Sequence, residues 1–451
     1  MARLFGTDGV RGTANGTLLP EMAYRLGRAA TLYFGREAKS PVTILIGRDT
    51  RISGTMLEAA LAAGITSAGG NTIMAGVIPT PGVAYLTKKM GLSAGIVISA
   101  SHNPFPDNGI KFFGGDGYKL PDDVEDELEK IVRHIENGDD YPRPQGEGIG
   151  IIEYRHDLIN QYIDFVCSTT EQRFDGMKVV LDCANGAAYV AMPAVLRRLG
   201  VRLKIIHALP NGVNINDGCG STHIESLRQA VLDNKAVLGI AHDGDADRCL
   251  CIDEKGNLID GDHILIMCAW LMMKEDALKD NKIVTTVMAN IGFHQGAKRI
   301  GATTEITKVG DRYVLENMLA NGYNLGGEQS GHIIFTDYST TGDGLITAVQ
   351  VLSALKQSGK TASELNALMT TYPQILLNVQ VKTKDGWDNN EAIKAAIAAG
   401  ETRLADRGRI LVRPSGTEPL IRVMAEGPDE SELKEICETI AAEVKKACGT
   451  A

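Results

Sequence analysis

The stretch VTILIGRDTRISG, from Val42 to Gly54, carries the pattern that decides the fold. It reads as a β-branched apolar run, a turn rich in Gly, Asp and Arg, and the start of a segment with small apolar residues at helical spacing. Two further stretches repeat the pattern: KVVLDCANGAA, from Lys178 to Ala188, and KIVTTVMANIGF, from Lys282 to Phe293. Strand, polar turn and helix in succession are the unit of α/β domains, whose sheets are covered by helices. The repetition therefore predicts several α/β domains.

The length of 451 residues suggests about three domains, and the order of helices and loops along the chain divides it into four. We expect these to be residues 1–153, 154–254, 255–370 and 371–451. Helices are predicted at Asp122 to Glu136, His156 to Ser168, Gly344 to Lys356 and Glu430 to Ala447. The last helix is amphipathic, and its apolar stripe predicts packing on a small sheet of its own domain. The stripe consists of Leu433, Ile436, Cys437, Ile440, Ala441 and Val444.

The charge balance limits the classes of partner. Acidic residues number 56 and basic residues 46, which gives a net charge of −10. Proteins that bind nucleic acid or anionic membranes need a broad basic surface, so neither class of partner is expected. An anionic ligand must therefore meet a local group of basic side chains.

Glycine is enriched, at 50 of 451 residues and without a Gly-X-Y period, which predicts many backbone positions with special dihedral angles.

The eight cysteines form no CxxC pair and no disulfide framework, which predicts reduced thiols in the cytosol. Cys249 and Cys251 have no further His or Cys partners nearby in the sequence, and we interpret them as core residues rather than zinc ligands.

The N-terminus has no signal-peptide character, and the longest apolar run, Ile264 to Met273, is far shorter than the ~20 residues that cross a membrane. A soluble, cytoplasmic monomer or homodimer with no membrane partner is expected.

The run HDGDADR (242–248) is the strongest candidate for a metal site. It follows a strand predicted at Ala236 to Ile240 and places Asp243, Asp245 and Asp247 at every second position. In an extended loop that spacing turns three carboxylates to one side, where hard oxygen ligands suit Mg²⁺. An EF-hand is excluded because Arg248 stands where that loop needs Gly. An acidic turn without a metal is the alternative, although three like charges this close repel one another unless a cation neutralises them.

The run VISASHNP (97–104) is a second candidate. It places Ser101 at the end of an apolar strand predicted at Gly95 to Ile98, with His102 and Asn103 beside it. Loops at the ends of strands are where α/β proteins place reactive groups. Taken with the three carboxylates elsewhere, a metal would bind an oxygen of the serine or of a phosphate that the serine carries. An ordinary turn is the alternative interpretation.

Two further loops suit a sugar phosphate. RPSGTEP (413–419) collects a guanidinium, two hydroxyls and a glycine, with a second guanidinium nearby, and such a set of donors favours phosphate binding over a plain turn. Its candidate residues are Arg413, Ser415, Gly416, Thr417 and Arg422. GGEQSGH (326–332) gathers polar side chains that suit sugar hydroxyls, with a polar hairpin as the alternative. Its candidates are Glu328, Gln329, Ser330 and His332. Neither a GxxxxGK[ST] loop nor a GxGxxG after a strand occurs, so a nucleotide site has no support.

Together and in this order, SASHNP, DGDADR, GEQSGH and RPSGTEP resemble the four loops of the α-D-phosphohexomutase superfamily. The opening LFGTDGVRG with GGEQSGH looks like the phosphoglucosamine mutase branch of that superfamily. The resemblance covers the whole chain. It implies three related α/β domains with mixed sheets and a smaller α+β C-terminal domain around a central cleft. In chain order these would be the phosphoserine, metal-binding, sugar-binding and phosphate-binding domains.

The resemblance also implies a reaction and its cofactors. The enzyme would be an isomerase that interconverts glucosamine 6-phosphate and glucosamine 1-phosphate through glucosamine 1,6-bisphosphate, upstream of UDP-N-acetylglucosamine and cell-wall precursors. It would hold one Mg²⁺ per subunit and a phosphoryl group on Ser101, with Ser101, Asp243, Asp245 and Asp247 as metal ligands. Its partners would be small hexosamine phosphates. The other implied site residues are, for catalysis, Arg11, His102, Lys111 and Arg248, and, for substrate binding, Lys308, Glu328, Gln329, Ser330, His332, Arg413, Ser415, Gly416, Thr417 and Arg422.

Other functions stay open at this point. A phosphoglucomutase or phosphomannomutase would share the same loops, although such enzymes tend to carry another residue where Gln329 stands. The choice of substrate therefore rests on the resemblance to one family branch. A metal-dependent sugar-phosphate phosphatase would also place a DxD run after a strand, although Asp247 stands where such enzymes usually have Thr or Val. A sugar-phosphate sensor on the same scaffold need not keep the serine, metal and phosphate loops together. The source of the phosphate on Ser101 and the general acid and base are not defined by the sequence.

Overall fold

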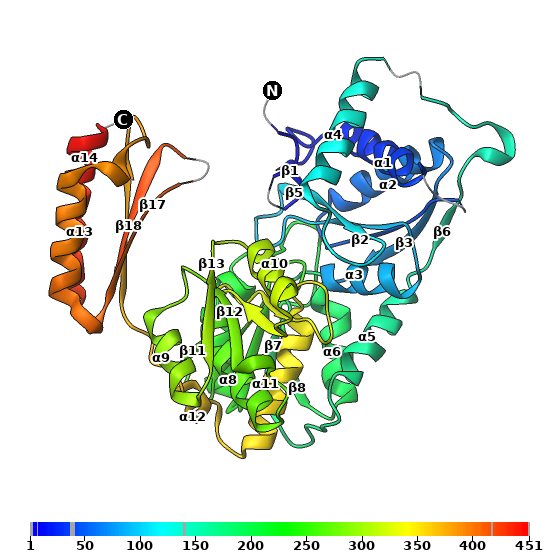
Figure 1. Cartoon of the computed structure of the whole chain (residues 1–451). Coiled ribbons are helices and arrows are strands. Elements are labelled where there is room, and N and C mark those ends of the chain that lie inside the picture. The colour runs from blue at the N-terminus through cyan, green and yellow to red at the C-terminus, as the bar shows by residue number, and fades with distance from the viewer. Residues whose placement is uncertain (1–2, 7, 37–40, 139–140, 416–417, 450–451) are drawn as a thin grey trace. The chain divides into compact units, whose positions relative to one another are not determined.

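The computed structural model describes residues 3–6, 8–36, 41–138, 141–415 and 418–449. The chain divides into two compact units (Figure 1). The larger unit consists of Met1–Met288 and Ala302–Leu368, and the smaller of Ala289–Gly301 and Met369–Ala451. The larger unit contains three sheets, and the smaller unit contains one.

The first sheet has six strands in the order β1-β5-β4-β2-β3-β6. β2, β3, β4 and β6 are parallel, whereas β5 and β1 extend the sheet in antiparallel pairing. Ile44 and Ile46 pack with the core on the α1, α2 and α4 side, and Leu45 packs with Val83 of α3 on the opposite side. This alternation explains why a continuous apolar run forms a strand that is buried on both faces. The elements are β1 Val10–Thr13, α1 Pro20–Phe34, β2 Thr43–Arg48, α2 Gly54–Ser67, β3 Asn71–Val77, α3 Thr80–Lys89, β4 Ala94–Ile98, β5 Asp107–Gly114, α4 Asp122–Glu136 and β6 Ile152–Tyr154.

The second and third sheets repeat this plan of parallel central strands with antiparallel neighbours at one edge. Their strand orders are β11-β10-β9-β7-β8 and β13-β12-β14-β15. The second sheet belongs to α5 Leu158–Ser168, β7 Lys178–Asp182, α6 Ala188–Arg198, β8 Arg202–Ile206, α7 Glu225–Asn234, β9 Leu238–His242, β10 Cys249–Asp253 and β11 Leu258–Ile259. The third belongs to α8 Gly261–Lys274, β12 Lys282–Thr286, β13 Thr303–Thr307, α10 Asp311–Asn321, β14 Leu325–Gly327, β15 Ile333–Phe335, α11 Gly344–Ser358 and α12 Ala362–Asn366.

The smaller unit has a different build. Its sheet is antiparallel, in the order β16-β18-β17. The predicted apolar stripe of its last helix is buried against this sheet, as expected. The helix α9, which lies between β12 and β13 in the sequence, belongs to this unit. The elements are α9 Ile291–Ile300, β16 Gln374–Gln380, α13 Glu391–Leu404, β17 Arg409–Pro414, β18 Leu420–Glu426 and α14 Glu430–Cys448.

The predicted fold class is confirmed: three α/β sheets of mixed direction precede a smaller antiparallel α+β domain. All eight cysteines are free thiols, and the Sγ atoms of Cys249 and Cys251 lie 3.9 Å apart in the core, as the sequence predicted. In the part of the chain that the structure describes, no helix is both long and apolar enough to span a membrane.

The predicted strand at Ala236 to Ile240 is displaced toward the C-terminus, because β9 is Leu238–His242. Lys235 ends α7 in a left-handed conformation, and the N–H of Ala236 still bonds back to the carbonyl of Val231. The strand therefore begins two residues later than predicted and runs through His242. As a result, the acidic loop starts directly at the end of the strand.

Candidate active site

Ser101 lies in the loop between β4 and β5 and is 2% exposed. Its φ of +51° is in the left-handed region that residues other than Gly and Asn rarely adopt. Its hydroxyl donates to Oδ2 of Asp243 at 2.5 Å, and its Oγ lies 3.4 Å from Nδ1 of His102. The structure thus brings together the serine loop of the first domain and the acidic loop of the second, as predicted.

Asp243, Asp245 and Asp247 follow β9 and gather their carboxylates around one point. One oxygen from each lies within 4.8 Å of the others. Oδ1 of Asp245 and Oδ1 of Asp247 are buried and have no hydrogen-bond partner among the described residues. Burial, together with the charges of Asp247 and Asp245, raises the pKa of Asp243 well above its usual range. Unpaired buried oxygens within a cluster of like charges fit a hard divalent cation such as Mg²⁺.

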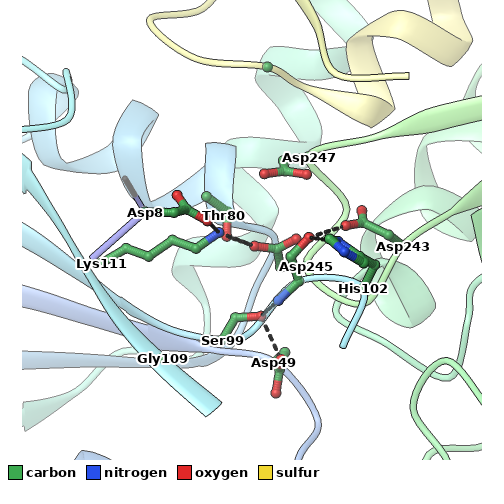
Figure 2. A network of polar contacts seen from close by, with 12 residues as sticks. Asp8, Asp49, Thr80, Ser99, His102, Gly109, Lys111, Asp243, Asp245 and Asp247 are labelled. Atoms are coloured by element: carbon green, nitrogen blue, oxygen red, sulfur yellow. Dashed lines mark hydrogen bonds and ion pairs between the residues drawn. The ribbon is translucent and has the colours of Figure 1, made fainter. Parts of the chain in front are cut away.

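Two residues of the first domain orient Asp245. Its Oδ2 accepts hydrogen bonds from the hydroxyl of Thr80 at 2.8 Å and from Nζ of Lys111 at 2.9 Å (Figure 2). The N–H of Thr80, at the start of α3, also donates to the main-chain carbonyl of Asp245 at 2.9 Å. These bonds occupy Oδ2 and leave Oδ1 toward the carboxylate cluster. Outer contacts of this kind fix the direction of a metal ligand.

Basic residues surround the serine on the side of the N-terminal segment. Asp8 lies 2.9 Å from Nζ of Lys119 and 3.2 Å from Nζ of Lys111, and it also pairs with Arg11. Lys119 reaches further, to Asp311 of the third domain at 2.5 Å. Burial alone would lower the pKa of Lys111, but the nearby Asp245 and Asp8 outweigh it and raise this pKa. Arg11, Lys111 and Lys119 therefore lie close together, with Asp8, Asp245 and Asp311 as their partners, and binding of an anionic ligand by this group stays a prediction.

A cavity of 680 Å³ opens over these groups within the larger unit. A cavity of this volume is large enough for a small ligand such as a sugar phosphate. Seven of the predicted site residues line it: Arg11, Ser101, His102, Asp247, Arg248, Glu328 and His332. Lys111, Asp243 and Asp245 are buried beneath them. Burial and the charges of Arg248 and Arg11 lower the pKa of His102.

The residues of the GEQSGH loop differ in how they relate to the cavity. Glu328 lines the cavity, and its Oε1 accepts the N–H of Gly310 at 3.0 Å. The hydroxyl of Ser330 is buried with no hydrogen-bond partner in the described part of the chain, as expected of a group that awaits a ligand. Gln329 instead donates to Oδ2 of Asp260 at 3.2 Å, at the N-cap of α8. Its predicted contact with substrate stays a prediction, as does that of Lys308, which lies over the ring of Tyr313.

His332 is 4% exposed and lies between two carboxylates. Its Nδ1 is 3.5 Å from Oδ2 of Asp247, and its Nε2 is 3.5 Å from Oδ2 of Asp311. Nε2 also accepts the N–H of Gly342 at 3.1 Å, which places the proton of a neutral ring on Nδ1, facing Asp247. His332 therefore links the GEQSGH loop to the acidic loop.

The RPSGTEP loop lies in the smaller unit. Arg413 and Arg422 are directly opposite partners on β17 and β18. Like charges at such a pair are destabilising, and burial together with Arg422 lowers the pKa of Arg413. Nζ of Lys384 donates to the carbonyl of Ser415 at 2.8 Å and adds a third cation. Arg422 also pairs with Glu418 at 3.4 Å, and an anion such as phosphate would neutralise more of this positive charge. Gly416 and Thr417, the other predicted ligands, lie outside the described residues.

Several residues that shape the site were not singled out from the sequence. Asp8 and Arg51 lie in stretches quoted above, LFGTDGVRG and GRDTRISG, but no spacing rule identifies them there. Thr80 and Lys119 belong to no motif. Thr80 contacts Asp245 of the second domain, and Lys119 contacts Asp8 of its own domain and Asp311 of the third. All four act through contacts between segments that are distant in the sequence.

Comparisons with known proteins identify the family of the chain. Four family models match in succession: phosphoglucomutase/phosphomannomutase alpha/beta/alpha domain I at residues 2–139, domain II at 156–256, domain III at 260–372 and the C-terminal domain at 376–443. A phosphoglucosamine mutase of Heliobacterium modesticaldum is 52% identical over 455 residues, covering 98% of this chain and 99% of its own. One of Desulforamulus reducens is 53% identical over 441 residues, covering 98% and 99%.

Solved structures share the fold at lower identity. A phosphoglucomutase/phosphomannomutase family protein from Burkholderia thailandensis has a TM-score of 0.82 at 23% identity, covering 100% of this chain and 98% of its own. The N-acetylphosphoglucosamine mutase of Aspergillus fumigatus, in complex with GlcNAc-6P and magnesium, has a TM-score of 0.69 at 19% identity, covering 99% and 96%.

Proposed function

The chain belongs to the phosphoglucosamine mutase family of isomerases, and we propose that it interconverts glucosamine 6-phosphate and glucosamine 1-phosphate through a phosphoserine at Ser101. The observation that carries this proposal is the buried hydroxyl of Ser101 bonded to Asp243, at the mouth of three clustered carboxylates. A hydroxyl in this position is placed to carry a phosphoryl group beside a divalent cation. The cytosolic location and the oligomeric state stay predictions from the sequence.

We propose one Mg²⁺, held by Asp243, Asp245, Asp247 and an oxygen of the phosphate on Ser101. Bound there, it would neutralise charge on the transferring phosphoryl group. The unpaired Oδ1 atoms of Asp245 and Asp247 support this ligand set. The protein's own part is to hold these oxygens in place, with Lys111 and Thr80 on the far side of Asp245.

The proposed reaction has two transfers. In the first, a hydroxyl oxygen of the sugar phosphate forms a bond to phosphorus as the bond between phosphorus and Oγ of Ser101 breaks, and the hydroxyl proton is released to a site base as Oγ takes up a proton. The resulting glucosamine 1,6-bisphosphate turns end for end. In the second transfer, Oγ of Ser101 gives up its proton to a site base and bonds to the other phosphorus, as the bond between that phosphorus and its sugar oxygen breaks and this oxygen takes up a proton. Atoms and charge balance over the cycle, and no external phosphate is consumed.

Positioning and charge neutralisation are the main demands of phosphoryl transfer. Nε of Arg248 lies 3.9 Å from Oδ1 of Asp247 and makes no hydrogen bond in the described structure. Arg248 also lines the cavity, so it is placed to contact a phosphoryl oxygen. Arg11 lines the same cavity on the side of the N-terminal segment. Glu328 and Ser330 would hold sugar hydroxyls in both orientations. Arg413 and Arg422 of the smaller unit would hold the phosphate that is not reacting.

The intact mass of the purified protein tests the phosphoserine. After incubation with glucose 1,6-bisphosphate, the wild type should gain one phosphoryl group on Ser101, and Ser101→Ala should gain none and lose turnover. A Ser101→Ala variant with full turnover would overturn the mechanism. Release of inorganic phosphate from sugar phosphate in proportion to enzyme turnover would instead support the phosphatase alternative.

The choice of sugar needs a separate comparison. The phosphorylated enzyme should turn over glucosamine 6-phosphate faster than glucose phosphate or mannose phosphate. A preference of tenfold or more for glucose or mannose phosphate, which corresponds to about 1.4 kcal/mol in the transition state, would contradict the glucosamine assignment. The full-length identity of 52% to proteins named phosphoglucosamine mutase supports glucosamine as the substrate.

A further inference from the structure

A buried ion pair lies beneath the serine loop. Asp49 and Arg51, in the turn after β2, are each 1% exposed, and Nε of Arg51 donates to Oδ2 of Asp49 at 2.8 Å. The N–H of Arg51 also donates to Oδ1 of Asp49 at 2.9 Å. A buried ion pair contributes little net stability by itself, since desolvation opposes the attraction between the charges. Its position in this protein therefore suggests another role.

The guanidinium of Arg51 donates hydrogen bonds to main-chain carbonyls of Ser101 and of the loop that follows it. Nη2 donates to the carbonyls of Ser101 at 2.9 Å and Asn103 at 2.8 Å. Nη1 donates to the carbonyl of Asp107 at 3.0 Å and to that of Pro104. Together with the bond to Asp49, all five N–H groups of the guanidinium are engaged. One side chain thus fixes four carbonyls between Ser101 and Asp107, the first residue of β5.

The carboxylate of the same pair holds the other side of Ser101. The N–H of Ser101 donates to Oγ of Ser99 at 2.9 Å, and the hydroxyl of Ser99 donates to Oδ2 of Asp49 at 2.6 Å. Figure 2 shows Ser99 bonded to Asp49 beneath the site. Both main-chain polar groups of Ser101 are therefore held by one ion pair, the carbonyl directly by Arg51 and the N–H through Ser99.

The left-handed backbone conformation of Ser101 needs such stabilising contacts. A left-handed conformation at a residue other than Gly costs about 1–2 kcal/mol and persists only where the surrounding structure determines it. Asn216 of the second domain adds two bonds, from its Nδ2 to the carbonyls of Ser101 at 2.9 Å and Asn103 at 3.0 Å. The conformation that turns the hydroxyl toward Asp243 is thus imposed from two domains.

We propose that Arg51 is a positioning residue for phosphoryl transfer: paired with Asp49, it holds Ser101 so that Oγ faces the acidic loop. This inference rests on the proposed phosphoserine mechanism. A displacement of about 1 Å in a reacting group costs about 100-fold in rate. Lysine at position 51 would keep the charge beside Asp49 but would lose the fork that spans four carbonyls. The substrate contacts proposed for Glu328 and Arg248 would be untouched.

The test compares Arg51→Lys with Arg28→Lys. Arg28 is a matched control because it is also fully buried in the first domain, donates to the carbonyl of Tyr141, and lies outside the site. For Arg51→Lys we expect kcat to fall about 100-fold with KM within threefold of wild type. The rate at which glucose 1,6-bisphosphate phosphorylates Ser101, followed by intact mass, should fall equally. Arg28→Lys should lower the melting temperature and leave both rates unchanged.

Ser99→Ala is the second variant, and it keeps the proposal testable if Arg51→Lys does not fold. It removes only the hydroxyl between Ser101 and Asp49, and a fall in kcat of about tenfold with unchanged KM is expected. Wild-type rates of Ser101 phosphorylation in a folded Arg51→Lys or Ser99→Ala variant would overturn the inference. Equal losses in Arg28→Lys would do so as well. Failure of the wild type itself to become phosphorylated on Ser101 would instead refute the proposed function.

Discussion

The hydroxyl of Thr80 lies 2.8 Å from Oδ2 of Asp245, so the first domain sets the direction of a carboxylate that belongs to the second. Thr80→Val keeps the shape of the side chain and removes this donor. We expect the affinity for Mg²⁺ or Mn²⁺ to fall about tenfold, because outer hydrogen bonds orient metal ligands. Isothermal titration of the dephosphorylated protein with Mn²⁺ measures this directly, without reference to turnover.

Thr80→Ser is the control for that measurement. It restores the hydroxyl and removes the methyl group, so metal affinity should stay within about twofold of wild type. If Ser weakens binding as much as Val does, packing rather than the hydrogen bond is responsible, and the role given to Thr80 is wrong.

Gly244 lies where the acidic loop meets the serine loop. A Cβ at this position would be 2.5 Å from the carbonyl oxygen of Ser101 and 2.9 Å from Nδ2 of Asn216. Gly244→Ala should therefore push the two loops apart and lower kcat by about 100-fold, since the reacting groups would be displaced. Gly427→Ala, where a Cβ would come no closer than 3.3 Å to a leucine methyl group, is the control. Equal steady-state kinetics for the two variants would contradict the close approach.

His207 makes stability depend on pH. Its Nδ1 lies 2.9 Å from Oδ2 of Asp182, and this hydrogen bond raises the pKa of His207 against an opposing effect of burial. A raised pKa means that the charged pair stabilises the fold fully below the unfolded pKa of about 6.5, and that the contribution disappears as pH rises through the folded pKa. His207→Asn, which tolerates the left-handed backbone here, should cost about 1 kcal/mol at pH 6 and less at pH 8.5.

Urea denaturation of both proteins at the two pH values measures this difference. A loss of stability that is equal at pH 6 and pH 8.5 would show that the charge of His207 is not involved.

The nearby Cys219 does not add a charge, because burial raises the pKa of its thiol to about 12. Asp182 also accepts the N–H groups of Ala184 and Gly220, so its carboxylate joins two segments that are distant in the sequence.

Tyr162 joins the second and third domains. Its hydroxyl on α5 donates to Oδ2 of Asp343, the N-cap of α11, at 2.8 Å, and both residues are buried. Tyr162→Phe would leave a buried carboxylate oxygen without this donor and should cost about 1–3 kcal/mol of unfolding free energy. Burial already raises the pKa of Asp343 to about 6, and the loss of the bond should raise it further.

Chemical denaturation measures that cost. Tyr338→Phe, at a side chain 39% exposed, should change stability by less than about 0.5 kcal/mol. A Tyr162→Phe variant as stable as Tyr338→Phe would show that the hydrogen bond to Asp343 contributes nothing to the unfolding free energy.

The sequence predicted the elements whose cause is local. Apolar runs such as Val42 to Ile46 form strands, and the spacing of Asp243, Asp245 and Asp247 at the end of a strand is enough to turn three carboxylates together. The contacts of Thr80 and Lys119 depend on how one domain packs on another, and no short-range pattern encodes them. The bond from Gln329 to Asp260 at the N-cap of α8 is another contact that the motif did not indicate, and the predicted substrate contact of Gln329 stays a prediction.

The helix α9 has a consequence for how the protein can be dissected. Asn290, at its N-cap, donates to the carbonyl of Tyr372 and accepts its N–H, and the N–H of Ile291 donates to the fully buried carboxylate of Glu426. The smaller unit is therefore assembled from two separate stretches of chain, and the polypeptide passes between the units three times. A fragment that begins near residue 371 would lack this helix and expose Glu426. The RPSGTEP loop therefore cannot be separated with its complete domain by one cut in the chain, and its proposed affinity for phosphate has to be measured in the whole chain.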